Sequence, residues 1–237
     1  MSSLRNAMPQ VPMSCPHPDS GVLPSAFCWS KFGIESGEAV GSIFARKERE
    51  RSANAGVFLW GIGTSIRPSL EALLDMTASP EVVFSPMRST AAPHDVRPGA
   101  VVAWRSATGL DGQPFEIPSG SLVTSRAPSS SRRTRHFALV CRSDTPLPDQ
   151  GTHGDEWVDD AQIRNILTGR PVGSSQVTSV VQSSGAGANP RYRVAFRAQL
   201  CEPHLLILED PEPVRLGKTM APAPQGLMRS VNCKPCS

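Results

Sequence analysis

The chain has 237 residues, 39% of them apolar and 19% charged, with a formal net charge of +3. That length supports one sizeable core or two small ones. The mild charge excludes a chain that is basic throughout, so any surface for an anionic partner has to be local.

The two ends of the chain differ in composition from its middle. Residues 1–24 are rich in Pro and Ser without a hydrophobic period, so we expect a disordered lead. This lead lacks the apolar block of a secretory signal, and no apolar stretch is long enough to span a bilayer. The sequence therefore predicts a cytoplasmic protein without membrane contact. We expect a single domain over 25–210 and a loose, Pro-rich tail over 211–237.

A strand and a helix are predicted first. Residues 25–32 alternate between apolar and polar side chains, which is typical of a strand. An apolar stripe after Ser36 predicts a helix, and Asn54 or Gly56 is expected to end it.

The next element is the apolar run 57–60. A continuous apolar run predicts a strand that is buried on both faces. A short helix is expected to follow, with Thr64, Ser65 or Ser69 as its cap and Pro68 in an early turn.

The rest of the chain predicts strands joined by long loops. Further strands are expected over 81–84, 99–104, 136–141, 176–181, 192–200 and 205–208. Residues 106–134 are expected to be mostly loop, and Asp159 to Leu167 a short helix ended by Gly169. About eight strands without regular intervening helices argue against a doubly wound parallel sheet. We expect an α+β fold, with a mostly antiparallel, barrel-like sheet and two or three peripheral helices.

One motif joins a predicted strand to a helix: Trp60-Gly61-Ile62-Gly63-Thr64-Ser65. Free amides and the helix dipole make such a turn a natural anion site. The third glycine of the dinucleotide fingerprint is absent, since position 66 is Ile, and no Lys stands in the Walker position. A tight turn without ligand and a turn that a ligand approaches closely both fit the pattern.

Three of the four tryptophans lie in early predicted strands: Trp29, Trp60 and Trp104. In a small barrel, side chains from neighbouring strands can converge at one mouth. An indole face stabilises a stacked base by roughly 1–3 kcal/mol, and it also suits a methylated cation. The alternative is that all three are core residues, as tryptophans often are.

Three segments resemble the EVE domains of the PUA-like superfamily. Phe27-Cys28-Trp29-Ser30-Lys31 is similar to their opening strand, and the Trp60 to Ser65 turn is similar to their Trp-x-Gly-Val-Arg-Asn turn. The segment 95–104 resembles their motif of lysine, Gly-Asp, apolar strand and aromatic residue. Gly63 and Thr64 replace the Arg-Asn pair of that family, and no acidic residue follows Gly99.

The resemblance covers about residues 25–105 and implies a small β-barrel whose aromatic pocket takes a modified or flipped base. The residues expected to line this base pocket are Trp29, Lys31, Trp60, Gly61, Gly63, Thr64, Ser65 and Trp104.

An arginine cluster precedes a predicted strand. Arg132, Arg133 and Arg135 stand directly before His136, and Arg126 lies a few residues upstream. Such a patch suits the phosphate backbone of a nucleic acid, since phosphate contacts supply sequence-independent affinity. A solvated surface loop is the alternative.

Metal and catalytic motifs are weak. Cys15, His17, Cys233 and Cys236 could form a zinc set, but they come from opposite ends of the chain. No nucleophile elbow, zinc-protease motif or phosphate loop occurs. We therefore expect no metal and no cofactor, and assign no catalytic residue.

Three hypotheses follow. The first is a module that binds DNA or RNA and recognises a modified or flipped base. The second is an enzyme for a nucleotide-like or anionic substrate at the Gly61 to Ser65 turn, with His94 or His136 carrying a proton. The third is a scaffold for protein partners.

Overall fold

The computed structural model describes residues 23–33, 40–63, 65–87, 101–124, 136–148, 157–159, 161–172, 177–183 and 192–213. Two helices and eleven strands form within these ranges. In chain order they are β1 (Ala26–Phe32), α1 (Val40–Ala53), β2 (Val57–Ile62), α2 (Arg67–Met76), β3 (Glu81–Pro86), β4 (Val101–Thr108), β5 (Val123–Thr124), β6 (His136–Arg142), β7 (Trp157–Val158), β8 (Ile163–Asn165), β9 (Thr178–Ser183), β10 (Tyr192–Arg193) and β11 (Phe196–Pro213). Strands dominate, which confirms the expected α+β class.

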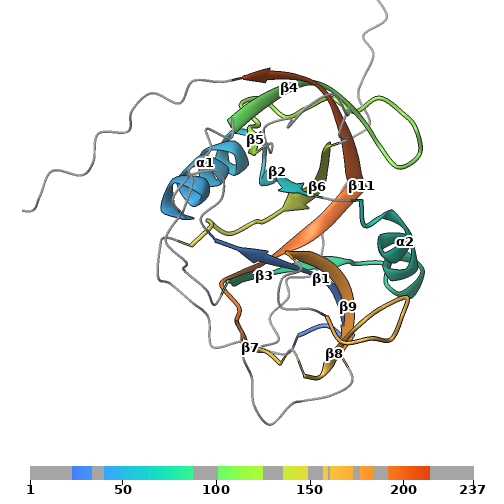
Figure 1. The fold of residues 1–237 in the computed structure, drawn as a ribbon. Helices are drawn as coiled ribbons and strands as arrows, with labels where there is room; N and C mark the ends of the chain where they lie inside the picture. The colour runs from blue at the N-terminus through green and yellow to red at the C-terminus, as the bar shows by residue number, and fades with distance from the viewer. Residues whose placement is uncertain are drawn as a thin grey trace, which may run out of the picture.

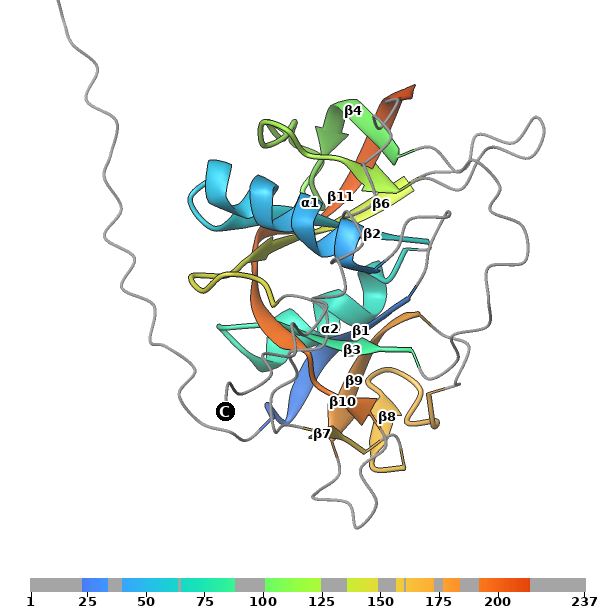
Figure 2. The same ribbon diagram turned by 90° about the vertical axis from the view of Figure 1, so that its left-hand side faces the viewer.

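One mixed sheet of nine strands organises the fold. Its main path runs β2-β6-β11-β3-β1-β9-β8, while β4 pairs with β11 and β5 pairs with β4. Strands β1 and β3 are parallel, and the other paired strands are antiparallel. Figure 1 shows β2, β4, β5 and β6 in its upper half and β1, β3, β8 and β9 in its lower half. Strands β7 and β10 form a separate small sheet, which lies near the bottom of the molecule in Figure 2.

Within the described residues this sheet does not close into a barrel, which corrects the barrel-like expectation. The sheet stays open because β11 is long and pairs with three different strands along its length. Its first part pairs with β3, its middle with β6 and its last part with β4. Figure 2 shows β11 as a strongly curved band that joins the two halves of the molecule.

The sequence predicted two separate strands where the structure has most of the long strand β11. A strand was expected over 192–200 and another over 205–208, but Tyr192 and Arg193 belong to β10, and one strand continues to Pro213. The β6–β11 register shifts between Leu200 and Leu205, where the ladder is irregular. This irregularity hides the continuity of the strand in the sequence pattern. The last residues of β11 pair with β4, past the point where a loose tail was expected to begin.

The predicted first helix corresponds to α1, and Gly56 lies just after its end. The amide of Gly56 donates to the carbonyl of Arg51 at 2.9 Å, and its φ is +91°. A Cβ there would lie 2.9 Å from the carbonyl oxygen of Ser143. Glycine is therefore required at this helix end, both for its backbone angle and for space.

The predicted second helix is α2, but its cap differs from the expectation. Ile66 occupies the N-cap position without a side-chain hydrogen bond, and Pro68 lies in the first turn as expected. The Oγ of Ser65 instead accepts a hydrogen bond from the amide of Arg67 at 3.3 Å. Among the described residues, neither helix has the length and apolar character needed to cross a bilayer.

The helix expected from Asp159 to Leu167 is wrong, because strand β8 lies in the described part of that stretch. Ile163 is 2% exposed and pairs with β9. The side-chain oxygen of Asn165 then accepts hydrogen bonds from the amides of Leu167 at 3.1 Å and Thr168 at 3.0 Å. Local bonds of this kind compete with helix formation.

Two sections of the sheet separate three apolar clusters, here called the central, lower and upper cores. The central core includes Cys28, Trp60, Leu70 and Leu139, the lower core Trp29, Val83 and Tyr192, and the upper core Leu59, Trp104 and Ala138. Strand β2 contributes to both the central and the upper core, which confirms that it is buried on both faces.

A buried ion network anchors α1 to β2. Glu50 is 2% exposed, and its carboxylate accepts hydrogen bonds from the Leu59 amide at 2.7 Å and from Ser121 Oγ at 2.6 Å. Lys47 Nζ donates to the same carboxylate at 2.7 Å and to the carbonyl of Leu122 at 2.8 Å. Burial lowers the pKa of Lys47, and the charge of Glu50 opposes that shift. These bonds replace the water that the charges lose on folding.

Candidate functional site

The three tryptophans expected in one pocket lie in three different cores. Trp29 is 1% exposed, Trp60 7% and Trp104 6%. Side-chain alternation along β1 gives the reason, since Trp29 and Ser30 leave the strand on opposite faces. Trp60 Nε1 donates to Ser30 Oγ at 3.1 Å, so strand β1 lies between the rings of Trp29 and Trp60. The expected pocket of three indoles is therefore not formed.

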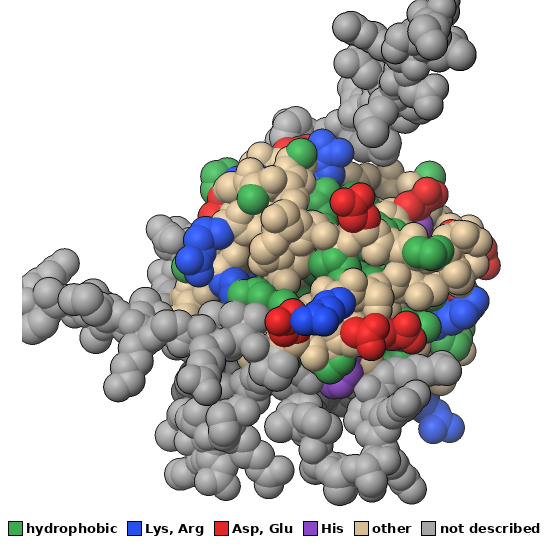
Figure 3. Space-filling model, turned by 90° about the horizontal axis from the view of Figure 1, so that it is seen from above, with side chains coloured by type: hydrophobic (Ala, Val, Ile, Leu, Met, Phe, Trp, Pro, Cys, Tyr) green, Lys and Arg blue, Asp and Glu red, His purple; other side chains and the backbone are tan. Residues whose placement is uncertain are grey.

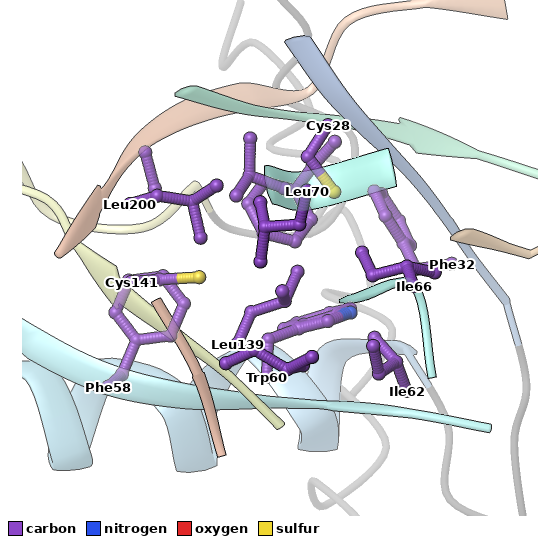
Figure 4. Close-up of a cluster of buried hydrophobic side chains, with 14 of the residues drawn as sticks. Cys28, Phe32, Phe58, Trp60, Ile62, Ile66, Leu70, Leu139, Cys141 and Leu200 are labelled. Carbon is purple, nitrogen blue, oxygen red and sulfur yellow. The ribbon is translucent and has the colours of Figure 1, made fainter. Parts of the chain in front are cut away.

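Trp60 is a packing residue of the central core. Its ring meets Phe84 edge to face, with 4.8 Å between the ring centroids. Figure 4 shows it among Ile62, Leu139 and Leu70. Its indole N–H is satisfied by Ser30, so this side chain has no donor left for a ligand.

Trp29 and Lys31, two members of the expected pocket, do lie together on the lower face of β1. Lys31 Nζ lies 4.8 Å from the ring centroid of Trp29 and 5.5 Å from that of Tyr192. Trp29 Nε1 donates to Ser85 Oγ at 3.1 Å. Lys31 is 2% exposed, so this group belongs to the lower core rather than to the rim of an open pocket.

A different pair of expected residues meets at the end of the upper core. Trp104 lies on β4 and His136 begins β6, with 4.7 Å between the ring centroids and an interplanar angle of 45°. Leu208 of β11 pairs with His136 on one edge and with Ala107 of β4 on the other. The two rings therefore approach one another from strands that flank β11.

The glycine turn after β2 reaches the same end of the sheet. Gly61 pairs with Ala138, close to His136 on β6. By alternation Gly61 shares a face with Leu59 of the upper core. A Cβ built at Gly63 meets no heavy atom within 4 Å among the described residues, so space is open there. The structure thus places the two glycines beside the start of β6, which carries His136 and its contact with Trp104, and it leaves out Trp29 and Trp60.

Trp104 carries an unsatisfied donor at this place. Its Nε1 is buried, and within the described part of the chain it has no hydrogen-bond acceptor. An unpaired buried donor costs about 1–3 kcal/mol. The neighbouring His136 is half-buried, and burial lowers its pKa, which favours the neutral imidazole. The pair combines an unused N–H with an uncharged aromatic ring.

The outer face of β4 and β11, beside this pair, carries mixed charge. Arg105 forms an exposed ion pair with Glu212 at 3.0 Å. Ser106 Oγ donates to Asp210 Oδ2 at 3.1 Å. Figure 3 shows acidic and basic side chains interspersed on this side of the molecule rather than one basic field. This outer face therefore offers no local attraction for a polyanion.

Several predicted site residues lie outside the described residues. They are Thr64, His94, Arg126, Arg132, Arg133 and Arg135. Of the predicted backbone contacts, His136 is described, and it is the one that meets Trp104. Ser65 is exposed, and its hydroxyl bonds to the first turn of α2.

Metal ligands and thiols can be compared with the structure only in part. No cluster of His, Cys, Asp and Glu suited to a metal ion occurs among the residues that the structure describes. The four terminal residues considered as zinc ligands lie outside these residues. Burial raises the pKa of Cys28 to about 12, so this thiol is a packing group and not a nucleophile.

Sequence reasoning missed two aromatic residues with a place in this geometry. Tyr192 meets Trp29 edge to face at 4.9 Å between ring centroids, and Trp157 lies exposed on β7. Tyr192 is the single tyrosine of the chain, which is a visible signal. Its contact with Trp29 joins distant segments, and no local pattern reports such a contact.

No family model, curated protein or solved structure matches this chain. The resemblance to EVE domains therefore rests on the sequence motifs alone.

Proposed function

We propose that this chain is a nucleic-acid-binding module that holds an unpaired or flipped base at the Trp104–His136 end of the upper core. The observation that carries the proposal is the buried Nε1–H of Trp104, which finds no acceptor among the described residues, beside the half-buried ring of His136. Base edges present ring-nitrogen and carbonyl acceptors, one of which would complete this donor. The imidazole ring supplies a surface on which a base stacks.

The position of the donor favours a base that has left its duplex. Trp104 is 6% exposed, so a base stacked between neighbours does not reach its Nε1. Proteins that read an extruded base enclose it and bond to its edge. The open space at Gly63, which follows directly on the part of β2 that pairs with β6, leaves room for a flat heterocycle.

In this proposal the phosphate backbone is held by the arginines that precede His136 in sequence. Arg132, Arg133 and Arg135 stand within four residues of one another, and Arg126 lies upstream. For single strands, each phosphate contact adds about −0.7 to the slope of log affinity against log salt. Replacing the three clustered arginines with alanine is expected to reduce that slope by about 2.

The decisive experiment compares two Trp→Phe variants. Trp104→Phe keeps an aromatic ring but removes the unsatisfied N–H, whereas Trp60→Phe removes an N–H that is already bonded to Ser30. Fluorescence anisotropy with labelled single-stranded DNA and RNA measures the affinity of each. We expect Trp104→Phe to weaken binding by about 5–10-fold, the loss of one hydrogen bond.

Trp60→Phe is the matched control, because its ring lies in the central core on the other face of β2. It should bind as the wild type does. The proposal is wrong if the wild-type chain binds neither nucleic acid, or if both variants bind equally well.

A further inference from the structure

Five strands enclose the upper core, and their junctions are not alike. The buried residues of this core come from β2, β4, β5, β6 and β11. Backbone ladders join β2 to β6, β6 to β11, β11 to β4 and β4 to β5. Strands β5 and β2 also lie against each other (Figure 1), but within the described ranges no ladder joins them. We call this last junction the β2–β5 seam.

Helix α1 joins the two sides of the seam through Glu50. Its Oε1 atom accepts a hydrogen bond from the amide of Leu59 on β2 at 2.7 Å. The same oxygen accepts a hydrogen bond at 2.6 Å from the hydroxyl of Ser121, which stands two residues before β5. One buried carboxylate thus bridges the seam where a backbone ladder would otherwise be needed.

The seam can open without leaving a buried charge unpaired. On the β5 side, Lys47 and Arg46 both donate to the carbonyl of Leu122. If β5 moves away, Lys47 Nζ keeps its partner, the Oε2 atom of Glu50 at 2.7 Å. Only the Ser121 hydroxyl and the Leu122 carbonyl leave α1, and water can bond to both. Opening any of the other four junctions would break backbone bonds between paired strands.

The seam lies beside Trp104. Val123 of β5 pairs with Val102 of β4, and both belong to the upper core. Trp104 follows Val102 by two residues, so its side chain leaves β4 on the same face. Its Nε1 is buried and has no acceptor in the part of the chain that the structure describes. A ligand therefore reaches this donor only when part of its cover moves aside.

We propose that the β2–β5 seam is the gate through which a base reaches Trp104, and that Ser121 is a positioning residue that holds the gate closed on Glu50. The inference rests on the proposed function, since the base is the ligand of that site. A base that completes the Trp104 donor binds the open state better than the closed state and so favours opening. The apparent Kd then equals the intrinsic Kd divided by the fraction of open molecules. Weakening the closed state should therefore strengthen binding.

The first test measures the affinity of Ser121→Ala for labelled single-stranded DNA and RNA. This variant removes the bond to Glu50 that only the closed state makes. We expect it to bind about 5–10-fold more tightly than the wild type, as for the loss of one hydrogen bond that opposes opening. Ser143→Ala is the matched control, because Ser143 is also buried but its hydroxyl donates to the carbonyl of Thr145 at 2.8 Å. It should bind as the wild type does.

The second test needs no ligand. The indole N–H of Trp104 exchanges with deuterium only when water reaches it, and NMR follows this exchange, with Trp104→Phe identifying the signal. Ser121→Ala should accelerate the exchange about 5–10-fold, because it raises the open fraction by that factor. Ser143→Ala should leave the rate unchanged. Equal acceleration in both variants would mean that exchange follows global unfolding, and this result would overturn the gate.

The outcomes separate this inference from the proposed function. If Trp104→Phe weakens binding while Ser121→Ala alters neither exchange nor affinity, the gate is refuted and the base site stands. Faster exchange in Ser121→Ala with unchanged affinity would also refute the gate, because opening would then not control access. If exchange responds as expected but the wild-type chain and Ser121→Ala bind no nucleic acid, the seam opens and the proposed function fails.

Discussion

The indole of Trp104 and the imidazole of His136 lie 4.7 Å apart between ring centroids, although their strands flank opposite edges of β11. The two strands come this close because β11 is paired on both sides at Ile207 and Leu208. The candidate site is therefore a product of the sheet order rather than of any single motif.

Trp60 and Trp104, which are both buried, should differ in what their indole N–H contributes to stability. Trp60→Phe breaks the bond to Ser30 and should lower the free energy of unfolding by about 1–3 kcal/mol. Trp104→Phe should cost less, because removing the unpaired donor offsets part of the lost packing. Urea denaturation followed by circular dichroism measures both values. A larger loss for Trp104→Phe would mean that its Nε1 has an acceptor in the folded chain.

The imidazole of His136 should titrate below its ordinary pKa of 6.5, because burial disfavours its charged form. The folded state then binds fewer protons than the unfolded state, so stability falls as the pH drops below about 6.5. NMR titration of the imidazole signals gives this pKa directly. Trp104→Leu should raise it towards 6.5 by letting water reach the ring. An unchanged pKa in this variant would mean that other neighbours desolvate His136.

Removal of the Glu50 carboxylate should be among the most damaging single changes in the chain. Glu50→Ala leaves Lys47 buried without its partner and should destabilise the fold by about 3–5 kcal/mol. Glu71→Ala is the control, since Glu71 is half exposed and pairs with Arg67 at 2.7 Å on the surface of α2. This change should cost less than about 1 kcal/mol. Similar losses for the two variants would contradict a structural role for the buried network.

The pair of Glu48 and Arg51 should make the protein sensitive to acid. Hydrogen bonds from Arg51 are the main cause that lowers the pKa of Glu48 from 4.5 to about 2. The folded carboxylate keeps its charge where the unfolded one does not, so the stabilisation is complete above about 4.5 and is lost as the pH falls towards 2.

Denaturation midpoints across this pH range test the pair. Glu48→Gln should be less stable at neutral pH and should lose less stability on acidification than the wild type. Arg51→Gln should behave in the same way, and the double mutant should add little, because both changes remove one interaction. An unaltered pH dependence in Glu48→Gln would assign the acid sensitivity to another carboxylate.

Elements with a strong local pattern were predictable. The strand at β1, the helix α1 and the doubly buried β2 follow from alternation, an apolar stripe and a continuous apolar run. The prediction failed where short-range bonds or long-range pairing overrode the pattern. Asn165 bonds locally and allows β8 in place of a helix, and β11 keeps one course through an irregular ladder.

The candidate site, too, could be predicted from the sequence only in part. Trp104, His136, Gly61 and Gly63 were all singled out from the sequence, but as members of larger sets that the fold does not keep together. Nothing in the sequence marked Trp157 as the exposed tryptophan, because its neighbours on β10 come from a distant segment.

The sequence by itself determined which residues alternate, that α1 stops near Asn54 or Gly56, and that strands dominate, because backbone preferences act between near neighbours. Only the tertiary structure decided which core each tryptophan enters. That choice depends on which strands pair with β1, β2 and β11 and thus on contacts between segments far apart in the chain. Alternation places Trp29 and Ser30 on opposite faces of β1. The order of the strands in the sheet then brings Trp60 to the face that carries Ser30, and it brings Trp104 beside His136.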